Sequence, residues 1–153
     1  MADVYLVACA KTKQTRASSA QDMYISPLFT KARHLARLRA DRWYILSAKY
    51  GLLHPSRLIE PYDETLKRMS GQGRRDWADR VLLALKAVIQ PGDKVVLLAG
   101  CNYRKLLIFD LRTMGCTVEC PLEGLPIGCQ LKWLNDTIRE DQVHRDPSSS
   151  RSG

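Results

Sequence analysis

Four short apolar runs, separated by longer amphipathic segments, set the pattern of the chain. They cover residues 4–8, 43–46, 94–99 and 117–120, and their β-branched and aromatic content is typical of strands. The first run is apolar throughout, which predicts a strand buried on both faces of a sheet. Each run is followed at once by small or polar residues, so each has a definite end.

Helical periodicity fills the intervals between these runs. Ser26 followed by Pro27 predicts a capped helix start, and an apolar stripe with the spacing of a helix follows it. The expected helices cover residues 26–38, about 74–89, 100–114 and 127–139. Gly71 and Gly73 are expected to break the chain before the second helix, and Gly115 to end the third.

Strands that alternate with helices four times predict an α/β class: one three-layer α/β/α domain with a mostly parallel sheet of about four strands. We expect this domain to cover residues 1–143. The polar, serine-rich stretch 14–24 is expected to be a loop that can close over a ligand. Residues 144–153 have the composition of a disordered tail.

The polar residues after the four strands are expected to meet. Right-handed crossovers place the carboxyl ends of parallel strands on one edge of the sheet, where open α/β sheets bind ligands. The residues expected to share a cleft there are Lys11, Lys13, Ser47, Lys49, Tyr50, Asn102, Tyr103 and Glu123. Cys9 follows the first strand, and Gly51 and Gly100 lie where the chain leaves the sheet, so we expect all three beside the ligand.

Composition is that of an ordinary soluble protein, with 45% hydrophobic and 26% charged residues. The apolar runs are too short to span a bilayer, and residues 1–3 do not begin a signal peptide, so we expect a cytoplasmic location. The five cysteines form no CxxC pair, and no histidine lies near Cys116 and Cys120, which are four apart. We expect no metal and no cofactor, with an iron–sulfur cluster as the alternative.

A net charge of +8 and a pI near 9.4 are typical of nucleic-acid binders, although a merely basic soluble protein is the alternative. The basic residues cluster in two segments, one over 31–42 and one over 67–80. Attraction to phosphates accounts for such clusters. The residues expected to contact a DNA backbone are Arg33, Arg37, Arg39, Arg74 and Arg75.

Five motifs together resemble a known group of proteins. They are Cys9-Ala-Lys-Thr-Lys13, Ser26-Pro-Leu-Phe29, Leu46-Ser-Ala-Lys-Tyr-Gly-Leu-Leu53, Glu60-Pro-Tyr-Asp63 and Pro121-Leu-Glu-Gly-Leu-Pro-Ile-Gly-Cys-Gln-Leu-Lys-Trp-Leu134. This set resembles a family of small bacterial and phage proteins, similar to a distant branch of the uracil-DNA glycosylase superfamily and to peroxide-stress DNA-binding proteins. One branch looks like phage-defence glycosylases that remove hypermodified bases. The resemblance implies an α/β/α fold and a base-binding cleft at the strand ends.

The resemblance assigns no catalytic residue, because the chain lacks the glycosylase motif Gly-Gln-Asp-Pro-Tyr. Cleavage of an N-glycosidic bond needs a carboxylate near the sugar and hydrogen-bond donors near the departing base. Asp63, with Glu60 second, is the expected catalytic carboxylate, and a surface ion pair is the alternative. Asn102 is expected either to donate to the base or to cap a helix.

The aromatic and basic residues of the cleft have two interpretations each. Tyr50, Tyr62 and Tyr103 are expected to stack on an extruded base or to pack within the protein. The lysines after the first two strands are expected to bind phosphates, and a buried one could instead attack the sugar to form a Schiff base.

The function expected from these observations is base excision: a DNA glycosylase, a hydrolase of N-glycosyl bonds, that removes a modified base, in phage DNA as antiviral defence. The expected partner is DNA, with no membrane and no obligate protein partner. Two alternatives remain open: a non-catalytic nucleic-acid-binding protein, and an N-glycosidase that acts on free nucleosides or nucleotides.

Overall fold

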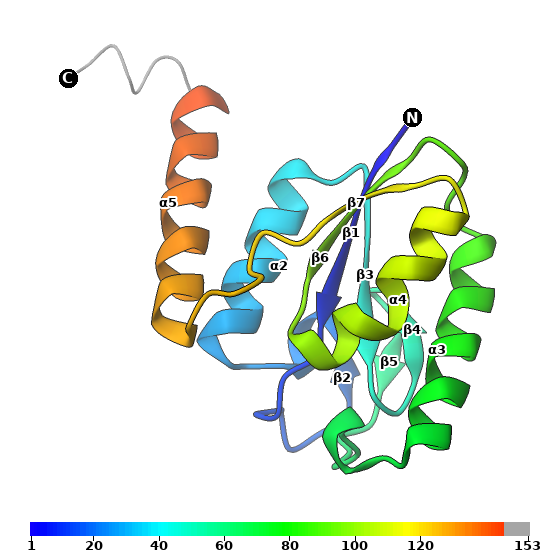
Figure 1. Cartoon of the computed structure of the whole chain (residues 1–153). Coiled ribbons are helices and arrows are strands. Elements are labelled where there is room, and N and C mark those ends of the chain that lie inside the picture. The colour runs from blue at the N-terminus through cyan, green and yellow to red at the C-terminus, as the bar shows by residue number, and fades with distance from the viewer. Residues whose placement is uncertain (146–153) are drawn as a thin grey trace.

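A five-stranded sheet in the order β4-β3-β1-β6-β7 forms the centre of the molecule (Figure 1). The computed structural model describes residues 1–145; the rest of the expected disordered tail, 146–153, lies outside the described residues. The strands are β1 (Asp3–Ala8), β3 (Arg42–Ser47), β4 (Gly51–Leu53), β6 (Lys94–Leu98) and β7 (Thr117–Glu119). Only β4 pairs antiparallel in this sheet. The expected α/β class with a mostly parallel sheet is confirmed.

Helices cover both faces of the sheet. They are α2 (Pro27–Arg39) and α5 (Ile127–Arg145) on one face, and α3 (Gly71–Lys86) and α4 (Cys101–Thr113) on the other. Alternate residues of β1 point to opposite faces, so Val4 and Leu6 pack in the α3–α4 core while Tyr5 and Val7 pack in the α2–α5 core. The first strand is therefore buried on both faces, as its apolar run predicts. Within residues 1–145, no helix is long and apolar enough to cross a membrane.

The helix boundaries confirm some expectations and correct others. Ser26 caps α2 by accepting a hydrogen bond from the Phe29 backbone N–H, and Gly115, with φ +89°, follows the end of α4. The break expected at Gly71 and Gly73 is wrong. Ser70 accepts a hydrogen bond from the Gly73 N–H, so both glycines lie in the first turn of α3, which ends at Lys86 rather than residue 89.

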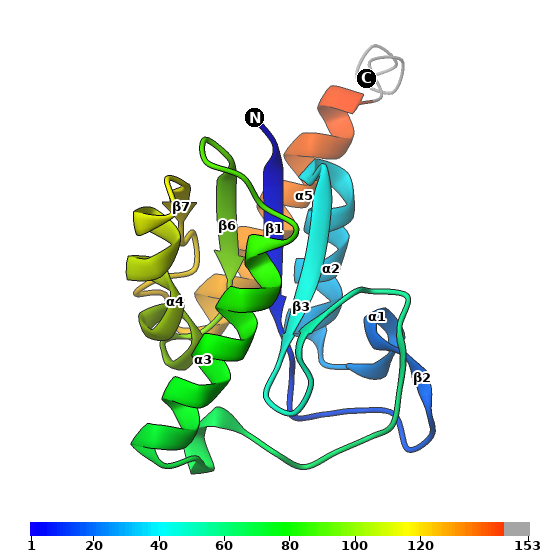
Figure 2. The same ribbon diagram turned by 90° about the vertical axis from the view of Figure 1, so that its right-hand side faces the viewer.

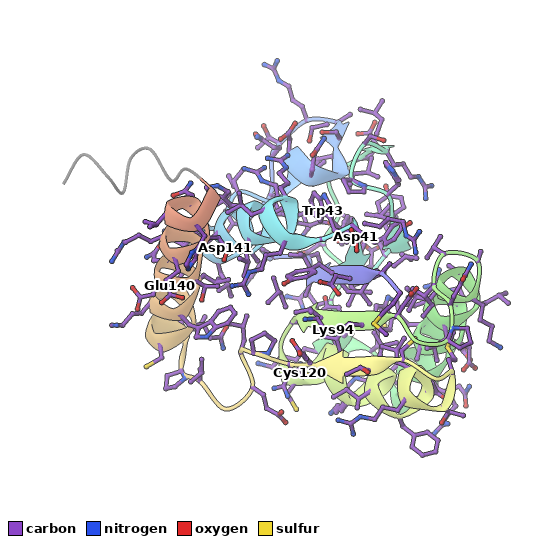
Figure 3. All side chains as sticks on the ribbon, turned by 90° about the horizontal axis from the view of Figure 1, so that it is seen from above. Asp41, Trp43, Lys94, Cys120, Glu140 and Asp141 are labelled. Atoms are coloured by element: carbon purple, nitrogen blue, oxygen red, sulfur yellow. The ribbon has the colours of Figure 1, made fainter. Side chains whose placement is uncertain are left out.

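The last helix is longer than its sequence pattern predicts. It was expected to fade after Arg139, but α5 continues to Arg145, so the first two residues of the expected disordered tail are helical. Asp141 lies on the side of α5 that faces α2 (Figure 3). Its carboxylate accepts two hydrogen bonds from Arg39, at 2.6 and 2.9 Å. This ion pair with a distant helix stabilises the last turns, and local periodicity cannot reveal it.

The stretch 14–24 is not the loop that its polar composition predicts. It contains β2 (Ser18–Ser19) and α1 (Ala20–Met23), and β2 pairs with β5 (Leu58–Ile59) in a separate two-stranded sheet. Met23 and Tyr24 are fully buried in the α2–α5 core. Burying these two large side chains anchors the segment, so it is a fixed wall at the carboxyl edge of the main sheet. In Figure 2 the segments that follow β1 and β5 run along this lower edge.

Candidate active site at the carboxyl edge of the sheet

The order of the strands places a topological switch point between β1 and β6. From β1 the chain crosses one face through α2 to reach β3, and it later reaches β6 through α3 on the opposite face. Open α/β sheets bind ligands in the crevice outside the carboxyl ends of such strands. A pocket of about 410 Å3 opens there, and we call it the switch-point pocket.

The switch-point pocket is largely apolar with a few polar groups at its edge. Its lining includes Val7, Ala8, Cys9, Lys11, Ser26, Phe29, Ala32, Leu98, Gly100, Tyr103, Leu122, Ile127, Gln130 and Leu131. The starts of α2, α4 and α5 therefore all border it. Four of the residues expected to bind substrate are among them: Cys9, Lys11, Gly100 and Tyr103. Gln130, whose amide donates to the Leu125 carbonyl at 2.8 Å, is an addition that only its place in the last motif could have indicated.

Cys9 and Tyr103 form a polar pair at the wall of this pocket. The Cys9 sulfur lies 3.0 Å from the Tyr103 hydroxyl, and the Tyr103 ring contacts Trp77 edge-on with centroids 5.5 Å apart. Burial, followed by the nearby Cys9 thiol, raises the pKa of Tyr103 above its ordinary value. This phenol therefore stays protonated at neutral pH and can donate a hydrogen bond.

A chain of hydroxyl groups lies beside this pair. The Tyr50 backbone N–H donates to Ser47 Oγ at 3.0 Å, Ser47 donates to Tyr62 Oη at 2.8 Å, and the oxygens of Tyr62 and Tyr24 are 2.6 Å apart. Ser47 is fully buried at the end of β3, and its carbonyl accepts from Trp77 Nε1 at 2.8 Å. Sequence reasoning missed Tyr24, because it ends a segment whose other residues are mostly polar.

The three hydroxyls of this chain interact with one another. Ser47 donates to Tyr62, the Tyr62 and Tyr24 oxygens are 2.6 Å apart, and a hydrogen bond with Ser47 also acts on Tyr24. Burial, followed by the nearby Cys9 thiol, raises the pKa of both phenols. Cys9, which acts on both phenols, lines the switch-point pocket, whereas Tyr62 lines the neighbouring hollow.

The expected catalytic carboxylates lie outside the switch-point pocket. Asp63 lines a neighbouring surface hollow of about 520 Å3 together with Lys49, Tyr62 and Arg68. Its side chain is 87% exposed and pairs with Arg68 at 3.3 Å, so the surface ion pair considered as its alternative is present. Glu60 is exposed; its backbone N–H and carbonyl each lie 3.4 Å from the Tyr50 hydroxyl.

The tyrosine rings of the site are occupied by cations of the same chain. Lys13 Nζ lies 4.5 Å from the centroid of the Tyr62 ring. Lys49 Nζ and the Arg57 guanidinium carbon lie 5.5 and 5.4 Å from the centroid of Tyr50. These contacts favour the packing interpretation of Tyr50 and Tyr62, because a stacked base would compete with the cations for the rings.

Four of the residues expected at the site, two glycines among them, lie in different local environments. Gly51 has φ +75°, and a Cβ added there would lie 3.6 Å from Val81. Gly100 has φ −74° and open space around it. Asn102 lies inside the first turn of α4 and does not cap it, since the N-cap is Gly100. Glu123 pairs with Arg104 at 3.3 Å.

Most of the arginines expected to contact DNA have hydrogen-bond partners within the protein. Arg33 donates to the Gln21 carbonyl at 2.7 Å and Arg37 to the Gln21 side chain at 2.5 Å, while Arg39 binds Asp141. Arg74 donates to the carbonyls of Leu66 and Lys67, in the short 3-10 helix η1 (Leu66–Arg68). Arg75 is exposed and has no side-chain partner among the described residues.

The structure places no metal-binding cluster in the described residues: among 1–145, no three His, Cys, Asp or Glu side chains are grouped to hold an ion. All five cysteines are free. Cys116 is buried, Cys9 and Cys120 are half-buried, and Cys101 and Cys129 are exposed.

Comparison with known proteins adds a family but no activity. A family model described as a family of unknown function, DUF6884, matches residues 4–136. The chain belongs to this family. The match includes every residue that lines the switch-point pocket. A search of curated proteins and a search of solved structures found no match.

Proposed function

We propose that this protein is a DNA N-glycosylase that holds an extruded base in the switch-point pocket and hydrolyses its N-glycosyl bond. The observation that carries the proposal is the pocket itself, which combines an apolar interior with the neutral phenol of Tyr103 at the ligand-binding edge of the sheet. Its volume lies within the range of roughly 300–1,000 Å3 common for small-molecule sites. A flat, mostly apolar base with polar edges matches such a lining.

The phenols supply what the departing base needs. Hydrolysis forms a bond from water oxygen to the sugar carbon, while the electron pair of the C–N bond goes to the base. Donors that already point to the position of this charge stabilise the transition state. Tyr103, which lines the pocket, is protonated at neutral pH because burial raises its pKa, and the same holds for Tyr24 and Tyr62 of the hydroxyl chain.

The sugar needs a negative charge on the other side of the bond. Asp63 remains the carboxylate that we propose for this role, with Glu60 second. Asp63 reaches the reacting carbon only if the nucleotide extends from the switch-point pocket across Tyr62 into the neighbouring hollow. The Arg68 pair fixes its position there. Lys13, above the Tyr62 ring, is the amine that would act if the reaction instead passes through a Schiff base.

One observation favours a second candidate function. The 87% exposure of Asp63 is unusual for a group that must act in a site from which water is excluded. A protein that binds DNA at this edge without cutting a bond would not require a buried carboxylate. A non-catalytic DNA-binding protein is therefore the second candidate.

The substrate and setting belong to the same proposal. Modified bases, and phage DNA as their source, follow from the resemblance of the five motifs alone. A cytoplasmic location is supported by the five free cysteines, since thiols stay reduced in that compartment.

A panel of oligonucleotides tests the proposal. Each contains one modified base, is incubated with the protein as a single strand or a duplex, and is then heated in alkali, which breaks DNA at abasic sites. We expect breaks at one class of base, and none with Gly100→Val, which adds a side chain at a position that lines the pocket and has open space around it. Gly71→Val is the control, since its Cβ also meets no atom within 4 Å and lies outside the pocket. Binding without breaks on every oligonucleotide would favour the second candidate.

A further inference from the structure

Two cations at the carboxyl edge share one aromatic ring. Lys49 Nζ lies 5.5 Å and the Arg57 guanidinium carbon 5.4 Å from the centroid of Tyr50. Both cations are exposed, and neither has an ion-pair partner among the described residues. A cation over a ring is held by the ring's electrons, which carry no net charge, so both positive charges remain available.

The ring that holds them is itself fixed. The Tyr50 backbone N–H bonds Ser47 Oγ at 3.0 Å, and its hydroxyl is 3.4 Å from both the N–H and the carbonyl of Glu60. The Tyr62 ring contacts Tyr50 edge-on with centroids 5.6 Å apart. Tyr50 therefore orients the two cations instead of offering a free face to a base.

Two of the three arginines expected to contact DNA from α2 are paired with carboxylates. Arg33 lies 3.4 Å from Asp22 and Arg39 2.6 Å from Asp141, which offsets part of their charge, while Arg37 donates to the neutral Gln21 side chain. Lys49 and Arg57 have no ion pair to give up, and the ring contact that orients them is worth about 0.5–1 kcal/mol at an exposed site. Binding a phosphate therefore costs less free energy at Lys49 and Arg57 than at arginines that are paired with carboxylates.

We propose that Lys49 and Arg57, held on the ring of Tyr50, form a phosphate clamp for the DNA strand beside the extruded base. This rests on the proposed function, because it takes DNA as the partner and the switch-point pocket as the place of the base. Lys49 also lines the hollow next to Tyr62, so a strand on the clamp passes the hydroxyl chain. Phosphate contacts of this kind fix the register of the strand and carry no sequence information.

Three carboxylates follow the clamp residues in the sequence, and two of them have no ion-pair partner in the described part of the chain. Asp63 is balanced by Arg68, whereas Glu60 and Glu64 are exposed and unpaired in the described part of the chain. An acidic protein segment would also be attracted to two free cations. A nucleic-acid strand is favoured because Lys49 lines the hollow next to Tyr62, at the same carboxyl edge of the sheet as the switch-point pocket.

Fluorescence polarisation with a labelled oligonucleotide tests the clamp over a series of salt concentrations. Lys49→Gln and Arg57→Gln should each weaken binding on every sequence and lower the slope of log affinity against log salt by about 0.7–0.9. Tyr50→Leu should weaken binding although it removes no charge, while Tyr50→Phe should not. The control is Lys86→Gln, which changes an exposed lysine in the last turn of α3. This variant should bind DNA as the wild type does.

Three results would overturn the clamp: an unchanged salt slope in the Lys49→Gln/Arg57→Gln double variant, no binding of DNA by the wild type, or displacement of DNA by polyglutamate as readily as by unlabelled DNA. The base-release assay separates this from the proposed function. Clamp-dependent binding without base release leaves the clamp and removes the glycosylase. Base release by the wild type, together with wild-type DNA binding by the Lys49→Gln/Arg57→Gln double variant, would keep the glycosylase and rule out the clamp.

Discussion

The hydroxyl oxygen of Tyr62 lies 2.6 Å from that of Tyr24 and also accepts a hydrogen bond from Ser47 at 2.8 Å. Tyr62 therefore takes part in both of these short contacts. Tyr62→Phe would remove both of them and leave Ser47 without this acceptor. Tyr24→Phe would leave the Ser47–Tyr62 bond intact. The chain thus has a central member, and the two phenols are not equivalent.

We expect Tyr62→Phe to lower the free energy of unfolding by about 1–3 kcal/mol. Tyr24→Phe should cost less, and the double variant should cost less than the two single costs added. Urea denaturation of the three variants measures this. If the two single variants lose equal amounts of unfolding free energy, and the double variant loses their sum, the hydroxyls act independently. Base release should fall about 100-fold or more with Tyr62→Phe if its proton reaches the departing base.

The two glycines at the sheet edge should respond differently to valine. Gly51 has φ +75°, a conformation that costs a β-branched residue about 1–3 kcal/mol, so Gly51→Val should lower the melting temperature clearly. Gly100 has a negative φ and open surroundings, so Gly100→Val should change stability by less than about 1 kcal/mol and act on the pocket. Measuring the melting temperature and the base release of each variant separates the effect on stability from the effect on the pocket. Similar destabilisation at both positions would contradict the distinction.

Asp93 should make stability depend on acid pH. Its carboxylate accepts from the backbone N–H groups of Gln90 and Ala2, each at 2.9 Å, and these bonds lower its pKa. A lowered folded pKa gives a stabilisation that is complete above the unfolded value of about 3.9 and lost as the pH falls through the folded value.

Asp93→Asn should therefore cost about 1–3 kcal/mol at neutral pH, and the difference from wild type should shrink in strong acid. Chemical denaturation of both proteins at neutral pH and in strong acid checks this. Asp79→Asn, at an exposed position without a described side-chain partner, is the control and should behave as wild type at both. A cost for Asp93→Asn that persists undiminished in acid would contradict the charged role.

The carboxylate variants test the catalytic assignment. Asp63→Asn removes the negative charge but keeps the shape, so base release should fall by a factor of about 100 to 1,000 while DNA affinity stays equal or rises slightly. Glu60→Gln should retain release. Loss of release in the Glu60 variant alone would move the role to Glu60, and full release in both would leave a lysine or neutral-donor mechanism.

The four parallel strands and their common edge could be predicted because each is a short, mainly apolar run, whereas the short strands β2, β4 and β5 were not expected. Parallel pairing brings the carboxyl ends of the four strands together, which is why Cys9, Lys11, Gly100 and Tyr103 were expected at one site and do line one pocket. Ser26 and Pro27 marked the start of α2 for an equally local reason, a side-chain cap and a fixed φ.

The partners of the side chains could not be predicted in the same way. Helical spacing indicates a basic face for α2, but Arg39 meets Asp141 from a position 102 residues away. Tyr24 is buried because a two-residue pairing between β2 and β5 holds its segment, and so short a pairing leaves no periodicity. The hydroxyl chain joins residues from three separate segments, so only the folded chain reveals it.

Mass balance of base release tests the central claim most directly. A duplex or single strand with the preferred base is incubated with the protein, and the free base and the abasic strand are both quantified by mass spectrometry. The account predicts that both form in equal amounts with the wild type and with Gly71→Val, and that neither forms with Gly100→Val. DNA that binds the wild type and yields no free base from any modification would contradict it, as would base release that Gly100→Val leaves unchanged.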